Sequence, residues 1–273
     1  PWAEQLLRGT MGVAGSAASG ARVAGRGAHL RLVKGSHIVV PRLFEHDHAY
    51  LFQGEDRRVV FAIPYERAFT LIGTTDVDHP GDPGVVSVSD EEVRYLCAAV
   101  GRYLRRPVSP DEVVWRYAGV RPLLDDATGA AAAVTRDYRL ETHTQPAPWL
   151  TVWGGKLTTF RKLAEAASHQ LAPYFSAMGP DWSAQQLLPG GDSAPLATLI
   201  QEYQHHAPWL DSAQATRIAT AYGTRARLWL PQQPVRLLGG CLAQEEVDYL
   251  VQHEWARSAD DILWRRSKLG LQF

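Results

Sequence analysis

The sequence predicts an α+β domain followed by a small all-α domain, and three observations lead to that expectation. Strand-like runs of β-branched and aromatic residues fill most of 29–147, with one strong helix among them. A strand and then a helix occupy 148–175. After a linker rich in proline, glycine and polar residues, 190–273 shows short helical patterns and little strand signal. Strands separated by one good helix favour a mixed or antiparallel sheet with helices on one face.

The first 28 residues are unlike the rest of the chain. Residues 1–28 have the pattern of a helix tail followed by a flexible loop rich in glycine, alanine and serine. The chain opens on Pro1 and has no initiator methionine. We therefore expect that residues upstream of Pro1 are missing.

The strands of 29–147 are predicted in order along the chain. "HLRLV" and "HIVVP" predict two strands that flank Lys34, Gly35 and Ser36. "AYLFQ", "RRVVFAIPY" and "FTLIGTTD" follow, with a hairpin turn at 54–56. Asp76, at the end of this run, either orients a cation or closes an Asx-type turn. "VVWRYAGVRPLL" and "AAAVTRDYRLETH" predict two more strands on either side of "DDATGA".

A helix is expected directly after Ser89. Ser89 has the residue type of an N-cap, and Glu92 completes a capping box. One side of this helix is apolar and is expected to be buried through Val93, Leu96, Cys97, Val100 and Leu104. Cys97 and the distant Cys241 both lie in apolar, helix-like surroundings, so we expect reduced core cysteines.

Composition narrows the range of functions. A formal net charge of -1 gives no indication of nucleic-acid binding. Arginine outnumbers lysine, which suits planar recognition of carboxylate or phosphate. No apolar run approaches the ~20 residues of a membrane-spanning helix. The alternation of His46, Asp47 and His48 lacks a third ligand nearby, so no metal site is predicted.

Two arginines, Arg121 and Arg136, flank the glycine-containing segment between the last two strands of 29–147. If a hairpin turn is centred between Thr128 and Gly129, the two arginines are cross-strand neighbours on one face. Side by side they would repel unless an anion bridged them, and together they would form a clamp for phosphate. A one-residue shift in register would place them on opposite faces, and two solvated arginines are the simpler alternative.

The stretch "PWLTVWGGKLTTFRKLAEAA" predicts a strand, a tight turn and a helix. Thr158 or Thr159 has the residue type of an N-cap. Lys156 then lies beside the positive end of a helix dipole, which is unfavourable for a cation. A bound anion would remove that conflict, and Gly154 and Gly155 would let it approach the backbone. The alternative is an ordinary turn with a solvated lysine.

His37 precedes an apolar strand. Because its ordinary pKa is ~6.5, a histidine at such a junction is a candidate general base, whereas the commoner role is that of a hydrogen-bonded structural residue. Near the C-terminus, Ile262, Leu263 and Leu269 are expected to point inward. The basic residues Arg265, Arg266 and Lys268 form a solvated face or meet anionic lipid.

Several of these motifs, in this order, resemble one protein family. They are "RLVKGSHIVVPRLFEHDHAYLFQ", "RRVVFAIPYERAFTLIGTTDVD", "EEVRYLCAAVGRYL", "VVWRYAGVRPLLDD", "AVTRDYRLE", "WGGKLTTFRKLAE" and "ADDILWRRSKLGL". They resemble the FAD-dependent, membrane-associated glycerol-3-phosphate dehydrogenases in their bacterial aerobic form, over nearly all residues from Leu30 onward. The fold that this implies is a glutathione-reductase/D-amino-acid-oxidase-like one. Its substrate-binding domain would span 29–147, the returning strand and helix of its FAD domain 148–175, and a helical domain 190–273.

The resemblance implies a reaction and roles for residues. Such enzymes oxidise sn-glycerol 3-phosphate to dihydroxyacetone phosphate by hydride transfer to FAD, and the electrons pass to a membrane quinone. Arg121 and Arg136 would hold the substrate. Lys156 would lie at the junction of substrate and flavin, and His37 near the reacting hydroxyl. The general base stays open between His37 and Lys156. The turn would contact the flavin through Gly154, Gly155, Lys156, Leu157 and Thr158.

The resemblance also implies surroundings and partners for the protein. It implies a cytoplasmic protein on the inner face of the bacterial plasma membrane, whose partners are glycerol 3-phosphate, a quinone and the membrane surface. Whether the protein forms a homodimer is left undecided. The Gly-x-Gly-x-x-Gly turn that binds the ADP part of FAD is absent after any predicted strand. We therefore expect this chain alone to bind FAD weakly and to be inactive. The alternatives are an oxygen-reducing glycerophosphate oxidase and a non-catalytic anion-binding module.

Overall fold

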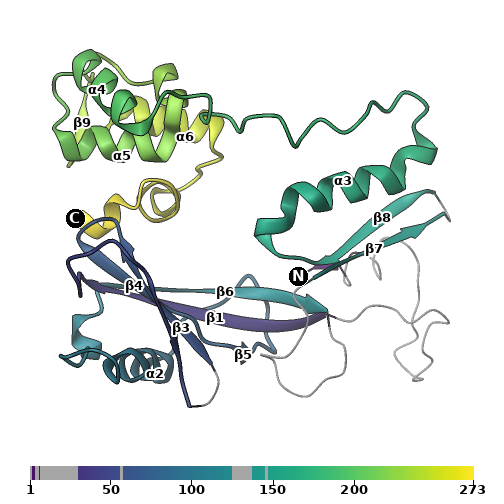
Figure 1. The fold of residues 1–273 in the computed structure, drawn as a ribbon, viewed down its shortest axis with the longest axis horizontal. Helices are drawn as coiled ribbons and strands as arrows, with labels where there is room; N and C mark the ends of the chain where they lie inside the picture. Colours follow the sequence, from purple (N-terminus) through teal and green to yellow (C-terminus); the bar gives the residue numbers. More distant parts are fainter. Residues whose placement is uncertain (1, 4–5, 7–29, 56–57, 125–136, 145–146) are drawn as a thin grey trace. The chain divides into compact units, whose positions relative to one another are not determined.

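Two compact units make up the chain, residues 1–184 and residues 185–273. The structure is a computed structural model, and it describes residues 2–3, 6, 30–55, 58–124, 137–144 and 147–273 (Figure 1). The first unit contains the antiparallel sheet and the helix that covers one of its faces. The second unit is mainly helical, as the sequence predicts.

The centre of the large sheet is one long strand, β1 (Leu30–Pro41). It pairs with β4 and β5 along one edge and with β6 along the other, and all of the pairings are antiparallel. The other strands of this sheet are β2 (Tyr50–Gln53), β3 (Val59–Tyr65), β4 (Phe69–Gly73), β5 (Val77–Asp78) and β6 (Trp115–Leu124). The expected break at 34–36 is wrong, because β6 pairs with β1 without interruption from Leu30 to Val39.

Helix α2 (Asp90–Gly101) covers one face of this sheet (Figure 1). It begins at Ser89, whose side chain accepts a hydrogen bond from the backbone N–H of Glu92, and the capping box expected from the sequence is confirmed. The apolar side of the helix packs on alternate residues of the central strands, including Ile38, Val40 and Ile72. The Cys97 thiol is free and buried in this core, and burial is the main cause that raises its pKa.

The last part of the first unit is a separate hairpin followed by a helix. Strands β7 (Tyr138–His143) and β8 (Trp149–Gly154) pair with each other. A 3₁₀ turn, η3 (Leu157–Thr159), leads into helix α3 (Phe160–Leu171). The hairpin expected around Thr128 and Gly129 lies outside the described residues and stays a prediction, while the described strand β6 pairs with β1 and β7 pairs with β8.

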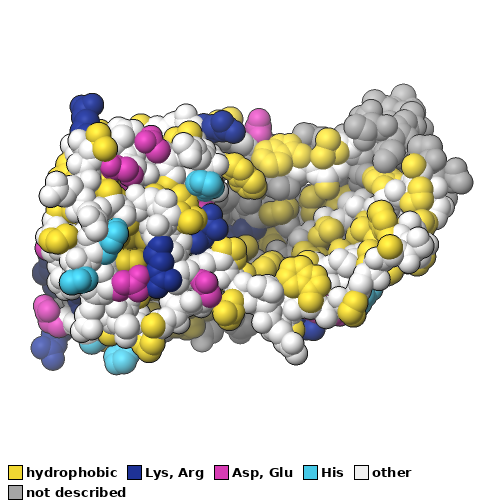
Figure 2. All heavy atoms as spheres, turned by 90° about the horizontal axis from the view of Figure 1, so that it is seen from above, with side chains coloured by type: hydrophobic (Ala, Val, Ile, Leu, Met, Phe, Trp, Pro, Cys, Tyr) yellow, Lys and Arg dark blue, Asp and Glu magenta, His cyan; other side chains and the backbone are white. Residues whose placement is uncertain are grey.

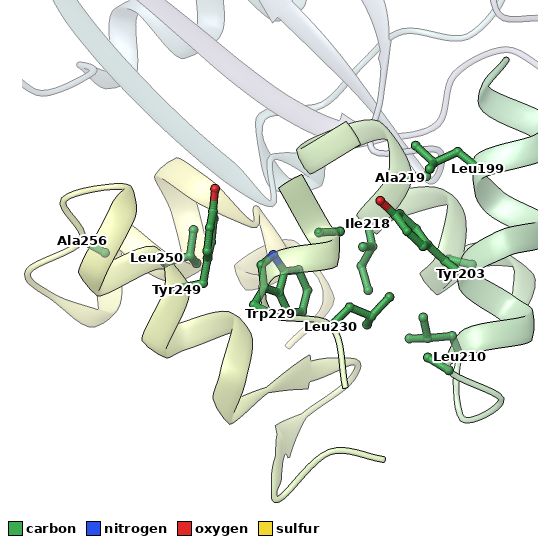
Figure 3. Close-up of a cluster of buried hydrophobic side chains, with 13 residues drawn as sticks. Leu199, Tyr203, Leu210, Ile218, Ala219, Trp229, Leu230, Tyr249, Leu250 and Ala256 are labelled. Carbon is green, nitrogen blue, oxygen red and sulfur yellow. The ribbon is translucent and has the colours of Figure 1, made fainter. Parts of the chain in front are cut away.

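The second unit is built around three α-helices, α4 (Leu196–His206), α5 (Ser212–Tyr222) and α6 (Gln244–His253). Their core contains large side chains from every helix, among them Tyr203, Ile218 and Leu250 (Figure 3). A small hairpin, β9 (Leu237–Gly239) and β10 (Leu242–Ala243), was not expected. Further 3₁₀ segments among the described residues are η1 (Pro110–Glu112), η4 (Ala172–Tyr174), η5 (Gly223–Leu228) and η7 (Leu269–Gln272).

The end of the second unit differs from the helix that was expected there. Residues Asp261–Arg266 form a π-helix, η6, before the final turn. Leu269 is fully buried, and Ile262 and Leu263 pack against the same small core, as expected. Cys241 belongs to this core and is free and buried, which confirms the expectation for both cysteines. Among the described residues, no helix has both the length and the apolar character needed to cross a membrane.

A buried ion pair links two helices of the second unit. Arg217 on α5 donates to both carboxylate oxygens of Glu246 on α6, each at 2.7 Å, and Tyr222 donates to the same carboxylate at 2.6 Å. The Glu246 side chain is 0% exposed and that of Arg217 is 10% exposed. Burial and the neighbouring carboxylate raise the pKa of Tyr222, so its hydroxyl remains a donor.

We predict that Glu246→Gln strongly destabilises the second unit, because it leaves a buried guanidinium without its counter-charge. The expected loss in the free energy of unfolding is ~3 kcal/mol or more. Glu202→Gln is a matched control, because Glu202 also pairs through two hydrogen bonds with an arginine, Arg227, but at the surface. Urea denaturation followed by tryptophan fluorescence measures both variants. If both variants lost the same free energy of unfolding, the prediction that burial makes the Glu246 pair more important would be contradicted.

Candidate active site

The sheet face opposite α2 carries three glycines on neighbouring strands. Gly35 on β1 lies directly across from Gly119 on β6, and Gly73 on β4 lies across from His37. A Cβ atom at Gly35 would overlap the guanidinium of Arg121, and one at Gly73 would overlap the imidazole of His37. These two glycines therefore provide flat surfaces on which the two functional side chains lie.

Arg121 is held by the segment that follows β4. Its Nη2 donates to Thr74 Oγ1 at 2.8 Å, and its Nη1 donates to Asp76 Oδ1 at 3.1 Å. Nη1 also lies 3.3 Å from the backbone oxygen of Thr75. Asp76 thus orients a cation, which is one of the two roles considered for it. The guanidinium is thus fixed in place across β1, only partly exposed, before any ligand binds.

His37, on β1, lies on the same face of the sheet as Arg121 of β6. Its ring stacks on Tyr117 with centroids 5.0 Å apart and an angle of 6° between the planes. Its Nδ1 is buried and has no hydrogen-bond partner among the described residues. Burial and, next, the positive charge of Arg121 lower the pKa of His37 to about 4. The imidazole is therefore neutral near pH 7, and a neutral imidazole is the form that accepts a proton.

A buried carboxylate on the opposite face supports this arrangement. Glu92 on α2 is 7% exposed and pairs with Lys34 Nζ at 2.8 Å. Its Oε1 accepts hydrogen bonds from Ser36 Oγ at 2.8 Å and Thr75 Oγ1 at 2.9 Å. Burial alone would raise the pKa of Glu92, but the hydrogen bonds from Lys34 and its other donors outweigh it and lower the pKa. Thr75 is thereby anchored beneath the sheet, while its neighbours Thr74 and Asp76 hold Arg121 above it.

The glycine turn after β8 forms a second part of the site. Gly154 and Gly155 have φ angles of 65° and 105°, a conformation that favours glycine. A Cβ atom at Gly154 would lie 3.6 Å from the backbone oxygen of Pro122, the residue after Arg121. The turn therefore packs against the end of β6 that carries the arginine.

Lys156 follows this turn at the N-cap of the 3₁₀ segment, and its side chain is exposed. No ion pair joins it to a described residue. Thr159, one of the two expected positions, is the N-cap residue of α3, but its side chain makes no capping hydrogen bond, and its hydroxyl donates instead to the Lys156 backbone oxygen at 2.9 Å. Leu157 and Thr158, as the first residues of a helical segment, have backbone N–H groups without an intrahelical acceptor.

The residues predicted from the sequence are thus only partly described. Arg121 and His37 lie together on one face of the sheet, and the turn with Gly154, Gly155 and Lys156 packs against the end of β6. Arg136 lies outside the described residues, so its pairing with Arg121 stays a prediction. Gly73, Tyr117 and Thr74 were not predicted. For Tyr117 and Gly119 a signal exists, since they share the face of Arg121 at a spacing of two residues along a strand.

Comparison with known proteins identifies the chain at the level of its family. The family model described as "FAD dependent oxidoreductase" matches residues 11–161, which is more than half of the chain. The chain belongs to this family. A second model, the C-terminal domain of alpha-glycerophosphate oxidase, matches residues 182–272. The resemblance inferred from the motifs is therefore confirmed, and FAD is the cofactor of the family.

Curated relatives are similar along most of this chain. A glycerol-3-phosphate dehydrogenase of Pseudomonas aeruginosa is 48% identical over 89% of the chain and 49% of its own length. The aerobic glycerol-3-phosphate dehydrogenase of Escherichia coli is 44% identical over 89% of the chain and 50% of its own length. A D-erythritol 1-phosphate dehydrogenase of Brucella abortus is 42% identical over 88% of the chain and 49% of its own length. The chain thus spans about half the length of the curated relatives it matches.

A solved structure shows the same fold. The glycerol-3-phosphate dehydrogenase of Bacillus halodurans, solved in complex with FAD, superposes with a TM-score of 0.69 at 25% identity. The match covers 98% of this chain and 51% of that one. The predicted fold class, an α+β FAD-dependent oxidoreductase domain followed by a helical C-terminal domain, is confirmed.

The residues of the glycine turn have the chemistry needed to hold the flavin part of FAD. Both glycines have a positive φ and no side chain, and the helix start that follows has no side-chain cap. Its free N–H groups and the Lys156 ammonium suit the electron-rich edge of a flavin ring. Gly154, Gly155, Lys156, Leu157 and Thr158 are therefore the residues of this chain that would hold it.

We predict that His37 makes the stability of the protein depend on pH. Because the pKa of His37 is lower in the folded state than its usual 6.5, the unfolded chain binds the proton first on acidification. The free energy of unfolding should fall by up to ~3 kcal/mol as the pH decreases from 6.5 towards 4.

Urea denaturation at a series of pH values measures this effect in the wild type and in His37→Gln. The variant should show a smaller dependence on pH across this range. Substitution of the exposed His48 by Gln serves as a control and should leave the wild-type dependence in place. The same dependence in His37→Gln as in the wild type would refute the role given to this histidine.

Proposed function

We propose that this chain supplies the substrate-binding half of an enzyme that oxidises sn-glycerol 3-phosphate to dihydroxyacetone phosphate. The observation that carries the proposal is the pairing of a fixed guanidinium with a neutral imidazole on one sheet face, next to the glycine turn. The names of the most similar relatives support the same reaction, and one of them acts on another polyol phosphate. A phosphorylated polyol is thus the proposed substrate class.

Each group then has a role that follows from its chemistry. Arg121 binds the phosphate, because a guanidinium offers paired donors to its oxygens, and Arg136 is the proposed second donor. His37 lies where a neutral imidazole accepts the proton of the hydroxyl group that becomes a carbonyl. FAD, when bound, supplies the acceptor for the hydride that leaves the same carbon. Lys156 places a positive charge beside the flavin edge.

The surface of the first unit exposes a group of large apolar side chains. The hairpin, α3 and the residues that follow expose large apolar side chains, and α3 has no buried residue. The exposed apolar side chains are Val152, Leu157, Phe160, Tyr174, Phe175, Met178 and Trp182. Many hydrophobic side chains, in yellow, lie on the right side of the view in Figure 2. Because the match covers only about half of the relatives' own length, we propose that the part of them outside the match covers this surface.

The electron acceptor is proposed separately. The resemblance favours a membrane quinone and a cytoplasmic protein bound to the inner face of the plasma membrane. The match of 182–272 to a domain of alpha-glycerophosphate oxidase favours a second candidate, in which oxygen is the acceptor. The basic C-terminal residues add little support for membrane contact. Arg265 pairs with Asp261 at 2.8 Å, and Arg266 donates to the backbone oxygen of Glu254.

We predict that the chain alone does not retain FAD, because its glycine turn would hold only the flavin part of the cofactor. Fusion of the chain to the part of the Pseudomonas aeruginosa relative that lies outside the match should restore both bound FAD and turnover of glycerol 3-phosphate. The flavin absorbance spectrum and the rate of reduction of a soluble quinone measure these two results. Peroxide formation in place of quinone reduction would favour the oxidase. Stoichiometric FAD on the chain alone would refute the prediction.

We predict that Arg121→Ala raises the KM of the fused enzyme for glycerol 3-phosphate by ~10- to 100-fold, because a charged donor to the phosphate is lost. The pKa of His37 should also rise, because the Arg121 charge is one of the two causes that lower it. Arg116→Ala is the matched control, since Arg116 lies on the same strand but pairs with Asp90 on α2. A KM that is equal in the two variants would contradict the proposal.

A further inference from the structure

Neither the backbone conformation nor any neighbouring described residue requires a glycine at position 119. It lies in the middle of β6 and is exposed, and its backbone is not in the left-handed region. A Cβ atom at this position would meet no described residue within 4 Å. Gly35 and Gly73 differ, because a Cβ atom there would overlap Arg121 or His37. A glycine inside a strand weakens it, and one use of such a glycine is close approach of a ligand.

The surroundings of Gly119 are the functional groups of the proposed site. Tyr117 and Arg121 lie two residues before and after it, on the same face of β6. Across the sheet, His37 is paired with Tyr117, and Gly35 is paired with Gly119. Of this pair of glycines, Gly35 is covered by the guanidinium of Arg121. No described residue covers Gly119 in the same way.

We propose that Gly119 is a specificity-determining residue, against whose Cα the carbon chain of the phosphorylated alcohol lies. This inference rests on the proposed function. A molecule whose phosphate contacts Arg121 and whose hydroxyl reaches His37 has its carbon atoms between these two groups. The missing Cβ atom at Gly119 provides the room for them, so a side chain here excludes the carbon chain but leaves the phosphate-binding guanidinium in place.

The test compares two ligands in variants of the full chain. Gly119→Ala, Gly119→Val and the wild type are titrated by calorimetry with inorganic phosphate and with glycerol 3-phosphate. Gly119→Val should weaken binding of glycerol 3-phosphate by ~10-fold or more and change binding of inorganic phosphate by less than ~2-fold. Gly119→Ala should fall between Gly119→Val and the wild type.

Two controls separate exclusion of the ligand from damage to the fold. Gly179→Val should bind both ligands like the wild type, because a Cβ atom at this exposed position also meets no described residue within 4 Å. The urea midpoint of Gly119→Val should not fall below that of the wild type. A lower midpoint together with loss of phosphate binding would assign Gly119 a structural role and overturn the inference.

The remaining outcomes distinguish this inference from the proposed function. If the wild type binds both ligands and Gly119→Val binds glycerol 3-phosphate equally well, the inference alone is wrong. If the wild type binds neither ligand, or if Arg121→Ala binds both as the wild type does, the proposed role of Arg121 is wrong. The inference then falls with it.

Discussion

The carboxylate of Glu92 is the contact on which the first unit depends. It joins the start of α2 to the middle of β1, through Lys34 and Ser36, and to the segment after β4, through Thr75. A buried carboxylate is costly unless it is both paired and hydrogen-bonded, and here it is both. Removal of one donor would leave a desolvated charge, so the helix, the strand and the segment are held as one.

The site above the sheet follows from this anchor because of strand alternation. Successive side chains of a strand point to opposite faces, so Lys34 and Ser36 reach Glu92 while Gly35 and His37 face the other way. The same separation occurs in the segment after β4, where Thr75 bonds to Glu92 and its two neighbours bond to Arg121. The polar network on the covered face therefore positions the groups on the opposite face without touching a ligand.

Much of the fold follows from local signals in the sequence. The capping box at Ser89 and Glu92 and the alternating strands depend on residues close in sequence, and these elements are found. The errors concern long-range pairing. Two strands were expected on either side of Lys34, Gly35 and Ser36, but the backbone of β6 and the carboxylate of Glu92 hold them in one continuous strand. The pairing of β6 with β1 along this whole length has no local signature in the sequence.

The same limit applies to the site. Residue type alone made Arg121, His37 and the glycine turn candidates, because charge, imidazole chemistry and freedom to adopt a positive φ belong to those residues themselves. The role of Gly73 is visible only where the ring of His37 lies on it, and that requires the pairing of β1 with β4. The low pKa of His37 likewise depends on burial and on an arginine 84 positions along the chain, which composition does not reveal.

The two thiols have a consequence for how motion in this protein is observed. Cys97 lies under the sheet of the first unit, Cys241 lies in the second, and both are free and buried. A thiol reagent reaches each one only when its own surroundings open. The chain therefore carries one natural chemical reporter for each unit, so that the opening rates of the two units are separable without any added label.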